Sequence, residues 1–257
     1  MRLMGNSGAT IHLGLRSVEK IGGRQDLMRE AGLLQILGED VCPKLIGILP
    51  DKSGYVMERC VPCTPLCGDD EYFWILDHVL DILQNMVWTW AADSTNDKWR
   101  TEIRSWTQEY APWIPDWLKT EATTLDMVCR MHGDPTLSNV LFRKQRPMEN
   151  DQLLIGDPIP SRPCVPSSHL VDYGKLIQSC MGWEHVLDDA WAEPSPKVLE
   201  WMLRQIPRRI LLPSLFWGAY HCARIGVTAT DEKRRTWGKA ASERLVQEAV
   251  QCSMPTT

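Results

Sequence analysis

The residues best suited to carry chemistry lie in the second half of the chain, where an acid, an amide and a second acid follow one another. His132, Gly133, Asp134 and Asn139 form the pattern His-Gly-Asp-x4-Asn, and Asp157 ends a later apolar run. A carboxylate such as Asp134 can accept the proton of a hydroxyl or orient an attacking oxygen. The amide oxygen of Asn139 and the carboxylate of Asp157 are hard oxygen donors of the kind that Mg²⁺ prefers. These residue types together indicate metal-assisted phosphoryl transfer.

A β-hairpin is the element that would position the two metal donors. Two short apolar runs, 140–142 and 153–155, are joined by a polar segment, which is typical of a hairpin. Such a hairpin would bring Asn139 and Asp157 together although they are far apart in the sequence. The alternative is that His-Gly-Asp is only a turn before a strand.

The rest of the chain reads as a small mixed part followed by a large helical part. Strand patterns occupy residues 11–15, running on through 18–21, then 44–50 and 54–58, around a helix over 26–37. Helical periodicity or composition then predicts helices over 72–92, 98–110, 115–131, 168–182, 195–206, 213–228 and 231–252. The fold class expected from this order is α+β.

At the His-Gly-Asp motif the chain resembles the protein-kinase-like superfamily, specifically its small-molecule branch of aminoglycoside phosphotransferases and choline kinases. That branch carries His-Gly-Asp where protein kinases usually carry His-Arg-Asp, and Gly133 matches the former. The resemblance implies a bilobal protein-kinase-like fold, with a small mixed N-lobe over residues 1–60 and a large, mainly helical C-lobe over residues 61–257.

The resemblance also implies roles for the residues of the motif. Asp134 resembles the catalytic base, Asn139 and Asp157 resemble the magnesium ligands, and His132 resembles a residue that braces the catalytic loop. Asp157 is followed by Pro158 and not by Phe-Gly, which disfavours a protein kinase.

A lysine and a glutamate in the N-terminal part resemble the pair that holds nucleotide phosphates in this superfamily. Lys20 ends a predicted strand and would grip the α- and β-phosphates, while Glu30 on the following helix would pair with it. Lys20 as a solvated surface charge is the alternative, and Glu30 could instead pair with Arg24 or Arg29.

Two further segments resemble nucleotide-binding parts of the family. Gly5 and Gly8 resemble a reduced glycine-rich loop whose amides could approach phosphate, although a plain turn is the alternative reading. Glu58 and Cys60 fall in the predicted hinge between the lobes, where backbone groups would contact the adenine edge, and Met57 would lie beside it.

The function expected from the resemblance is the transfer of a γ-phosphate from ATP or GTP to a hydroxyl of a small molecule, with Mg²⁺ as cofactor. Two alternatives remain open at this point. One is a Ser/Thr protein kinase of divergent sequence, and the other is a nucleotide-binding pseudokinase that acts as an interaction module.

Composition and net charge limit the classes of binding partner that the chain is expected to have. The chain has 257 residues, with 28 Lys plus Arg against 33 Asp plus Glu, and a formal charge of −5. An acidic chain has no global attraction to nucleic acid or anionic membranes, so neither partner is expected. Without a secretory signal or a long apolar stretch, a cytoplasmic monomer or homodimer with reduced cysteines is expected.

Cysteine spacing suggests one competing metal site. Cys60, Cys63 and Cys67 form C-x2-C-x3-C, but zinc patterns add a second Cys or His pair, and the only nearby candidate is His78. Packing is therefore the preferred interpretation of these cysteines.

Tryptophan is unusually frequent, with 12 Trp against 3 Phe, and seven of the Trp lie between residues 74 and 117. By resemblance, the group of Trp99, Trp106, Trp113 and Trp117 lies near the acceptor cleft, where aromatic walls can hold a cation or stack a sugar. Core packing is the alternative use.

Overall fold

The structure is a computed structural model, and the residues it describes are 2–4, 9–22, 26–86, 88–90, 101, 104–123, 127–129, 131–144, 152–159 and 169–254. Contacts between Cα atoms divide the chain into two compact units. The sheet unit comprises Met1–Thr64 and His132–Pro160, and the helical unit comprises Pro65–Met131 and Ser161–Thr257. The segment with the His-Gly-Asp motif therefore groups with the first 64 residues. The predicted lobes, 1–60 and 61–257, placed that segment with the helices, and the lobe boundary stays a prediction.

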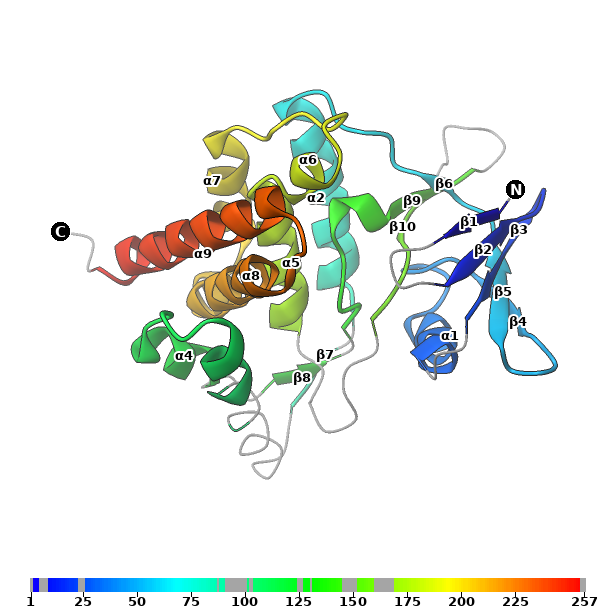
Figure 1. Cartoon of the computed structure of the whole chain (residues 1–257), viewed down its shortest axis with the longest axis horizontal. Helices are drawn as coiled ribbons and strands as arrows, with labels where there is room; N and C mark the ends of the chain where they lie inside the picture. Colours follow the sequence, from blue (N-terminus) through cyan, green and yellow to red (C-terminus); the bar gives the residue numbers. More distant parts are fainter. Residues whose placement is uncertain are drawn as a thin grey trace. The chain divides into compact units, whose positions relative to one another are not determined.

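An antiparallel sheet of five strands, in the order β1-β2-β3-β5-β4, forms the first part of the sheet unit (Figure 1). Its strands are β1 (Arg2–Met4), β2 (Thr10–Leu13), β3 (Ser17–Ile21), β4 (Leu45–Ile48) and β5 (Gly54–Glu58). The register pairs Lys20 of β3 directly with Tyr55 of β5. Predicted strands over 44–50 and 54–58 are confirmed, apart from their ends.

Helix α1 (Asp26–Leu37) packs against this sheet through one apolar stripe. Leu27, Ala31, Leu34 and Leu37 recur at helical spacing, and all four are buried. Burial of each leucine contributes about 1.5–3 kcal/mol, which is how a twelve-residue helix becomes stable. The stripe also orients Glu30 inward, since Glu30 adjoins Ala31 on the buried side.

A turn interrupts the strand that was predicted to run from residue 11 on through residue 21. The Gly14 amide donates to the Ser17 carbonyl at 2.9 Å, and the chain reverses direction between β2 and β3. Leu15 lies in this turn and is 97% exposed. The prediction of a continuing strand is wrong because alternation along the sequence does not reveal a reversal that a small residue permits.

The second part of the sheet unit is the predicted hairpin. β9 (Val140–Arg143) pairs antiparallel with β10 (Gln152–Ile155), and the pair Val140–Ile155 closes one end. The short β6 (Val61–Pro62) adds a third strand beside β9. A further bond, from the Ile155 amide to the Val41 carbonyl at 2.8 Å, ties the hairpin to the loop after α1. The hairpin is confirmed.

The helical unit contains most of the remaining elements. They are α2 (Asp69–Gln84), β7 (Trp88–Trp90), α4 (Asp116–Thr123), β8 (Met127–Cys129), α5 (His169–Cys180), α6 (Trp183–Leu187), α7 (Pro196–Gln205), α8 (Arg208–Thr228) and α9 (Glu232–Ser253). Residues 104–110 are also helical. Side-chain caps define two starts: Ser195 Oγ accepts from the Lys197 amide, and Asp231 accepts from the Arg234 amide.

Two predicted helices end early. The helix predicted over 72–92 ends at Gln84, and the one predicted over 115–131 ends at Thr123. The residues beyond each end form β7 and β8, which pair with each other antiparallel. Trp-Thr-Trp and Met-Val-Cys have the composition of strands, but each segment needs the other, remote one to complete its hydrogen bonds.

Helices α5, α8 and α9 form the packed centre of the helical unit and lie side by side (Figure 1). A Cβ on Gly174 of α5 would lie 2.5 Å from the Trp217 Cβ of α8, so a glycine is needed for this close approach. Trp106 packs on the same cluster, with ring centroids 6.2 Å from Trp217 and 6.3 Å from Tyr220. Trp106 is thus half-buried against the buried aromatic residues of α8, and its part in an acceptor cleft stays a prediction.

The other tryptophans of the expected acceptor wall are placed differently. Trp113 is 42% exposed and donates to Ser242 Oγ at 3.4 Å, Trp117 is 38% exposed, and Trp99 lies outside the described residues. Their part in an acceptor cleft stays a prediction.

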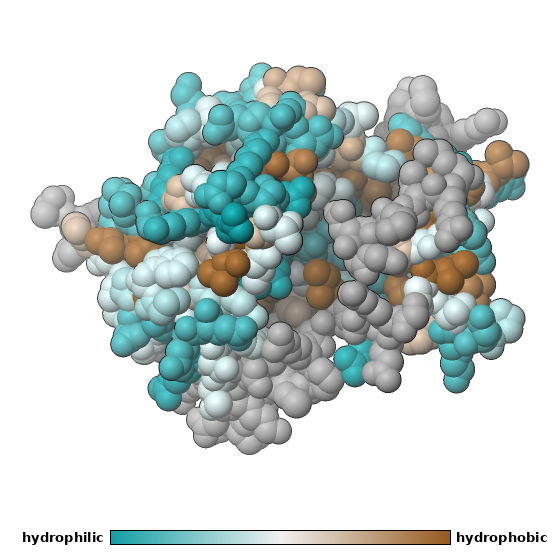
Figure 2. Space-filling model, in the orientation of Figure 1, coloured by the Kyte–Doolittle hydropathy of each residue, from teal (hydrophilic) through white to brown (hydrophobic). Residues whose placement is uncertain are grey.

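The surface is mixed in character. On the face of the helical unit drawn in Figure 2, hydrophobic residues form small separate patches among hydrophilic ones. Among the described helices, none has the length and apolar character needed to cross a membrane.

Candidate active site

The His-Gly-Asp loop is held in place by a buried histidine. His132 is fully buried, its Nδ1 accepts from the Asp134 amide at 3.3 Å, and its Nε2 lies 3.2 Å from the Ile155 carbonyl of β10. Because Nδ1 accepts and Nε2 faces an acceptor, the proton is on Nε2. Burial lowers the pKa of His132 to about 4, so the imidazole is neutral at neutral pH. His132 thus fixes the loop against the hairpin, as a bracing residue would.

Gly133 adopts a backbone conformation that favours glycine. Its φ is +88°, and an added Cβ would lie 2.5 Å from the Ile159 carbonyl oxygen. The Ile159 amide in turn donates to the His132 carbonyl at 2.9 Å, so the segments that meet here cannot separate without losing a hydrogen bond. The glycine of the motif is therefore needed for the shape of the loop.

Replacing Gly133 with Ala is expected to lower the free energy of unfolding by about 1–3 kcal/mol, because a positive φ and a backbone clash are added together. Urea denaturation measures this change. The matched control is Gly32→Ala in α1, where an added Cβ meets nothing within 4 Å. That control is expected to stabilise the protein by about 0.5–1 kcal/mol. Equal stability of the two variants would show that the loop is not constrained.

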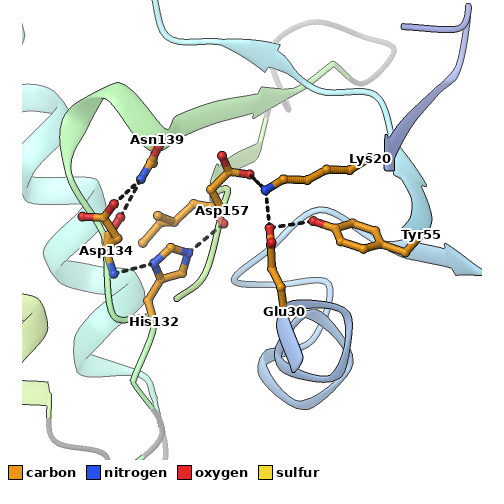
Figure 3. Close-up of polar contacts among 8 residues, drawn as sticks. Lys20, Glu30, Tyr55, His132, Asp134, Asn139 and Asp157 are labelled. Atoms are coloured by element: carbon orange, nitrogen blue, oxygen red, sulfur yellow. Dashed lines mark hydrogen bonds and ion pairs between the residues drawn. The ribbon is translucent and has the colours of Figure 1, made fainter. Parts of the chain in front are cut away.

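Asp134 and Asn139 face each other across the turn that leads into β9 (Figure 3). The short helical turn Leu137–Asn139 carries Asn139 back toward the motif. Its Nδ2 donates to the Asp134 carbonyl at 2.9 Å and to Asp134 Oδ2 at 3.2 Å. Since both neighbours are acceptors, the amide nitrogen must point at Asp134. The amide oxygen is then left for another ligand, and it has no partner within the described part of the chain.

The hairpin brings the backbone of Asn139 into contact with Gly156, the residue before Asp157. The Gly156 amide donates to the Asn139 carbonyl at 2.7 Å, which joins the residue before Asp157 to Asn139. Asp157 has a φ of +53°, an uncommon conformation that Asp and Asn adopt more readily than other side chains. Its side chain is 51% exposed, and Oδ1 bonds Lys20 Nζ at 3.2 Å. The second carboxylate oxygen has no partner among the described residues.

Lys20 is a buried cation held by two acids. Its side chain is 4% exposed, and Nζ lies 2.6 Å from Glu30 Oε1 in addition to its bond with Asp157. Burial works to lower the pKa of Lys20, but the Asp157 and Glu30 carboxylates outweigh it and raise the pKa above its ordinary value. The reading of Lys20 as a solvated surface charge is wrong, and Glu30 pairs with Lys20.

Tyr55 is a site residue that the sequence reasoning missed. Its hydroxyl donates to Glu30 Oε1 at 2.6 Å, and the residue is fully buried. Burial raises the pKa of Tyr55, so the phenol keeps its proton and acts as the donor. The signal that could have found it is strand register, because Tyr55 lies directly opposite Lys20 on the neighbouring strand.

The predicted hinge follows β5. Met57 is buried, and the carboxylate of Glu58 forms an ion pair with Arg143 of β9 and accepts from the Lys44 amide at 2.7 Å. The Glu58 amide donates to the Lys44 carbonyl at 2.9 Å, so neither that amide nor the Glu58 side chain is open to a ligand. Arg143 was not singled out in the sequence, because nothing local indicates its partner across the sheet unit.

Cys60 differs from its neighbours in this hinge. Within the described residues its backbone amide and carbonyl have no hydrogen-bond partner. Burial raises the pKa of the Cys60 thiol to about 11, so the thiol is protonated at neutral pH. Cys60, Cys63 and Cys67 are free cysteines, and no group of three or more His, Cys, Asp and Glu side chains among the described residues could hold a metal.

Gly5 and Gly8, the predicted glycine-rich loop, lie outside the described residues. Their proposed contact with phosphate stays a prediction. The remaining predicted site residues all belong to the sheet unit, and polar contacts link six of them in two groups. One group joins Lys20, Glu30 and Asp157, and the other joins His132, Asp134 and Asn139 (Figure 3).

No family model matches the chain, and no curated protein matches its sequence. Solved structures are similar in fold. A choline/ethanolamine kinase family protein from Mesorhizobium loti is 12% identical with a TM-score of 0.58, over 99% of this chain and 88% of that one. A glucosamine kinase in complex with glucosamine, ADP and inorganic phosphate is 12% identical with a TM-score of 0.57, over 97% and 81%. An aminoglycoside phosphotransferase in complex with GDP and kanamycin is 12% identical with a TM-score of 0.55, over 99% and 93%.

These similarities establish the fold. The chain has the α+β, protein-kinase-like fold of the small-molecule kinases, with a small antiparallel sheet and a mainly helical remainder. The fold class predicted from the sequence is confirmed, and so is the resemblance at the level of fold.

Proposed function

We propose that the protein is a phosphotransferase that moves the γ-phosphate of ATP or GTP to a hydroxyl of a small molecule. One observation carries the proposal: two groups of polar contacts bring a candidate base, two oxygen donors and a buried lysine into the same compact unit. Asp134 and Asn139 form the first group, and Lys20, Glu30 and Asp157 form the second (Figure 3). Phosphoryl transfer needs these parts and little else from a protein, because positioning and charge stabilisation supply most of the acceleration.

Asp134 acts on the acceptor. Its carboxylate accepts the proton of the acceptor hydroxyl, the hydroxyl oxygen forms a bond to the γ-phosphorus, and the bond from that phosphorus to the bridging oxygen of the nucleotide breaks. The nucleoside diphosphate leaves with the electron pair of that bond. Asn139 holds one carboxylate oxygen at 3.2 Å, so the base is oriented before the acceptor arrives.

Lys20 acts on the nucleotide. A charged Nζ that is fixed by Glu30 offers a point charge and hydrogen-bond donors to the α- and β-phosphates. The bond with Asp157 at 3.2 Å is the longer of its two ion pairs and involves a half-exposed carboxylate. A phosphate of the nucleotide can therefore accept a hydrogen bond from Lys20 Nζ while the bond between Lys20 and Glu30 persists.

Asn139 and Asp157 are suited to hold Mg²⁺. Their available donors are an amide oxygen and a carboxylate oxygen, and Mg²⁺ is usually bound by a few protein oxygens together with substrate phosphates and water. When bound, the ion would neutralise charge on the phosphates.

The nucleotide base is assigned to the hinge. The backbone amide and carbonyl of Cys60 are available to bond the edge of a purine, and the buried Met57 offers an apolar surface to its face. Of the Glu58 backbone groups, only the carbonyl is proposed to contact the base, because the Glu58 amide already donates to the Lys44 carbonyl. Both ATP and GTP stay candidate phosphate donors, since the solved structures of similar fold contain ADP or GDP.

The direct test is a phosphotransfer assay. Purified protein with MgATP or MgGTP is offered choline, glucosamine, kanamycin and a metabolite extract, and mass spectrometry follows the gain of one phosphate. We expect the nucleotide to raise the melting temperature of the protein, and at least one hydroxyl compound to be phosphorylated. The active species is expected to be a monomer or a homodimer. Nucleotide binding without transfer to any acceptor would favour a pseudokinase, and transfer only to Ser or Thr of proteins would favour a protein kinase. Absence of nucleotide binding would overturn the proposal.

A further inference from the structure

The tyrosine on β5 makes an unusual contact at the base of the lysine–glutamate pair. Tyr55 Oη and Lys20 Nζ both lie 2.6 Å from the same atom, Glu30 Oε1, in surroundings that are almost fully buried (Figure 3). We propose that Tyr55 is a positioning residue, which holds the Glu30 carboxylate so that Lys20 is fixed where it can bind nucleotide phosphates. The inference rests on the proposed function.

The need for such an anchor follows from the partners of Lys20. In the absence of nucleotide, Lys20 is held from two sides, by Glu30 and by Asp157. Asp157 is also the proposed magnesium ligand, so a bound metal would compete with Lys20 for its carboxylate. Glu30 would then be the main anchor of Lys20, and anything that fixes Glu30 also fixes the lysine.

Tyr55 is well placed to fix Glu30. It lies on β5, which pairs with β3 on one side and β4 on the other, so its backbone is held from both sides. A buried tyrosine has few rotatable bonds and loses little entropy when its hydroxyl is engaged. Glu30 lies on α1, and the bond from Tyr55 therefore ties that helix to the sheet through the site itself.

The chemistry of the donor also matters. A second cation beside Glu30 would divide the negative charge of the carboxylate between two positive groups. The neutral phenol donates a hydrogen bond instead and leaves Lys20 as the single cation on that oxygen. The lysine thus stays charged and oriented for an anionic ligand.

The test compares two buried tyrosines. Tyr55→Phe removes only the hydroxyl and is expected to raise the Kd for MgATP, or for MgGTP if that is the nucleotide bound, about tenfold, because a bond to a charged partner is lost. The KM for the acceptor should stay unchanged. Tyr72→Phe is the control, since it removes a buried hydroxyl that donates to the Ala192 carbonyl at 2.8 Å in the helical unit. The control is expected to leave the nucleotide Kd within twofold.

A double-mutant cycle separates positioning from general destabilisation. In a Glu30→Ala background, Tyr55→Phe is expected to change the nucleotide Kd by less than twofold, because no acceptor remains for the Tyr55 hydroxyl to hold. Tyr55→Met, which also lacks the hydroxyl, is the second variant if Tyr55→Phe does not fold. Calorimetry gives the Kd values and urea denaturation reports folding.

The outcomes distinguish this inference from the function on which it rests. An unchanged Kd in Tyr55→Phe, or a tenfold effect that persists in the Glu30→Ala background, would overturn the positioning role while the parent still binds nucleotide. If the parent binds neither MgATP nor MgGTP, the proposed function fails and the inference fails with it.

Discussion

Replacing Asp134 with Asn is expected to lower kcat by a factor of about 10²–10⁴, the range typical of a lost general base. Asparagine has the shape of aspartate but cannot accept the acceptor's proton. Its amide oxygen can still receive the bond from Asn139 Nδ2, which spans 3.2 Å to Asp134 Oδ2. The loop should therefore keep its structure, and the nucleotide Kd should change by less than about threefold, because the proposed role of Asp134 is toward the acceptor and not toward the phosphates.

Single-turnover measurements with saturating nucleotide and acceptor report this loss directly. The matched control is Asp116→Asn, which removes a surface carboxylate that bonds Lys119 at 3.0 Å in the helical unit. The control should retain full activity, since an exposed ion pair contributes little. Transfer by Asp134→Asn within threefold of the parent rate would mean that another group is the base.

Replacing Asp157 with Asn is expected to reduce activity about 100-fold at limiting Mg²⁺ and to raise the Mg²⁺ concentration needed for half-maximal activity. The variant loses a negative charge from the proposed metal site. Asparagine tolerates the φ of +53° at this position, and Lys20 keeps its 2.6 Å bond with Glu30. The loss should thus come from the metal and not from the fold.

A Mg²⁺ titration of parent and variant measures the shift, and chelation with EDTA should abolish activity in both. Urea denaturation without metal serves as the control for folding, and we expect similar midpoints because the Asp157 side chain is half exposed. If the Mg²⁺ requirement of Asp157→Asn equals that of the parent, the metal ligand lies elsewhere.

Local patterns predicted much of this fold. Apolar residues at helical spacing from Leu27 to Leu37 predicted α1, and the apolar runs 140–142 and 153–155 predicted the β9–β10 hairpin. The helix is specified by residues three or four positions apart, and the hairpin by two neighbouring runs. The information for both elements therefore lies close together in the sequence.

Elements that depend on remote partners were predicted poorly. The segments Trp88–Trp90 and Met127–Cys129 pair with each other, and helical periodicity was extended over both. The turn at residues 14–16 was missed for a related reason, because alternation is equally compatible with one long strand or two paired ones.

The sequence by itself determined the candidate chemistry of this protein. The motif around Asp134 and Asn139, with Asp157 at the end of the next strand, has the residue types that phosphoryl transfer uses, and its resemblance to small-molecule kinases implies that activity. Only the tertiary structure decided how the nucleotide side of the site is held. The contacts of Glu30 with Lys20 and Tyr55 depend on the register of β3 against β5 and on the packing of α1, and both arise from burial between segments that are separated in the chain.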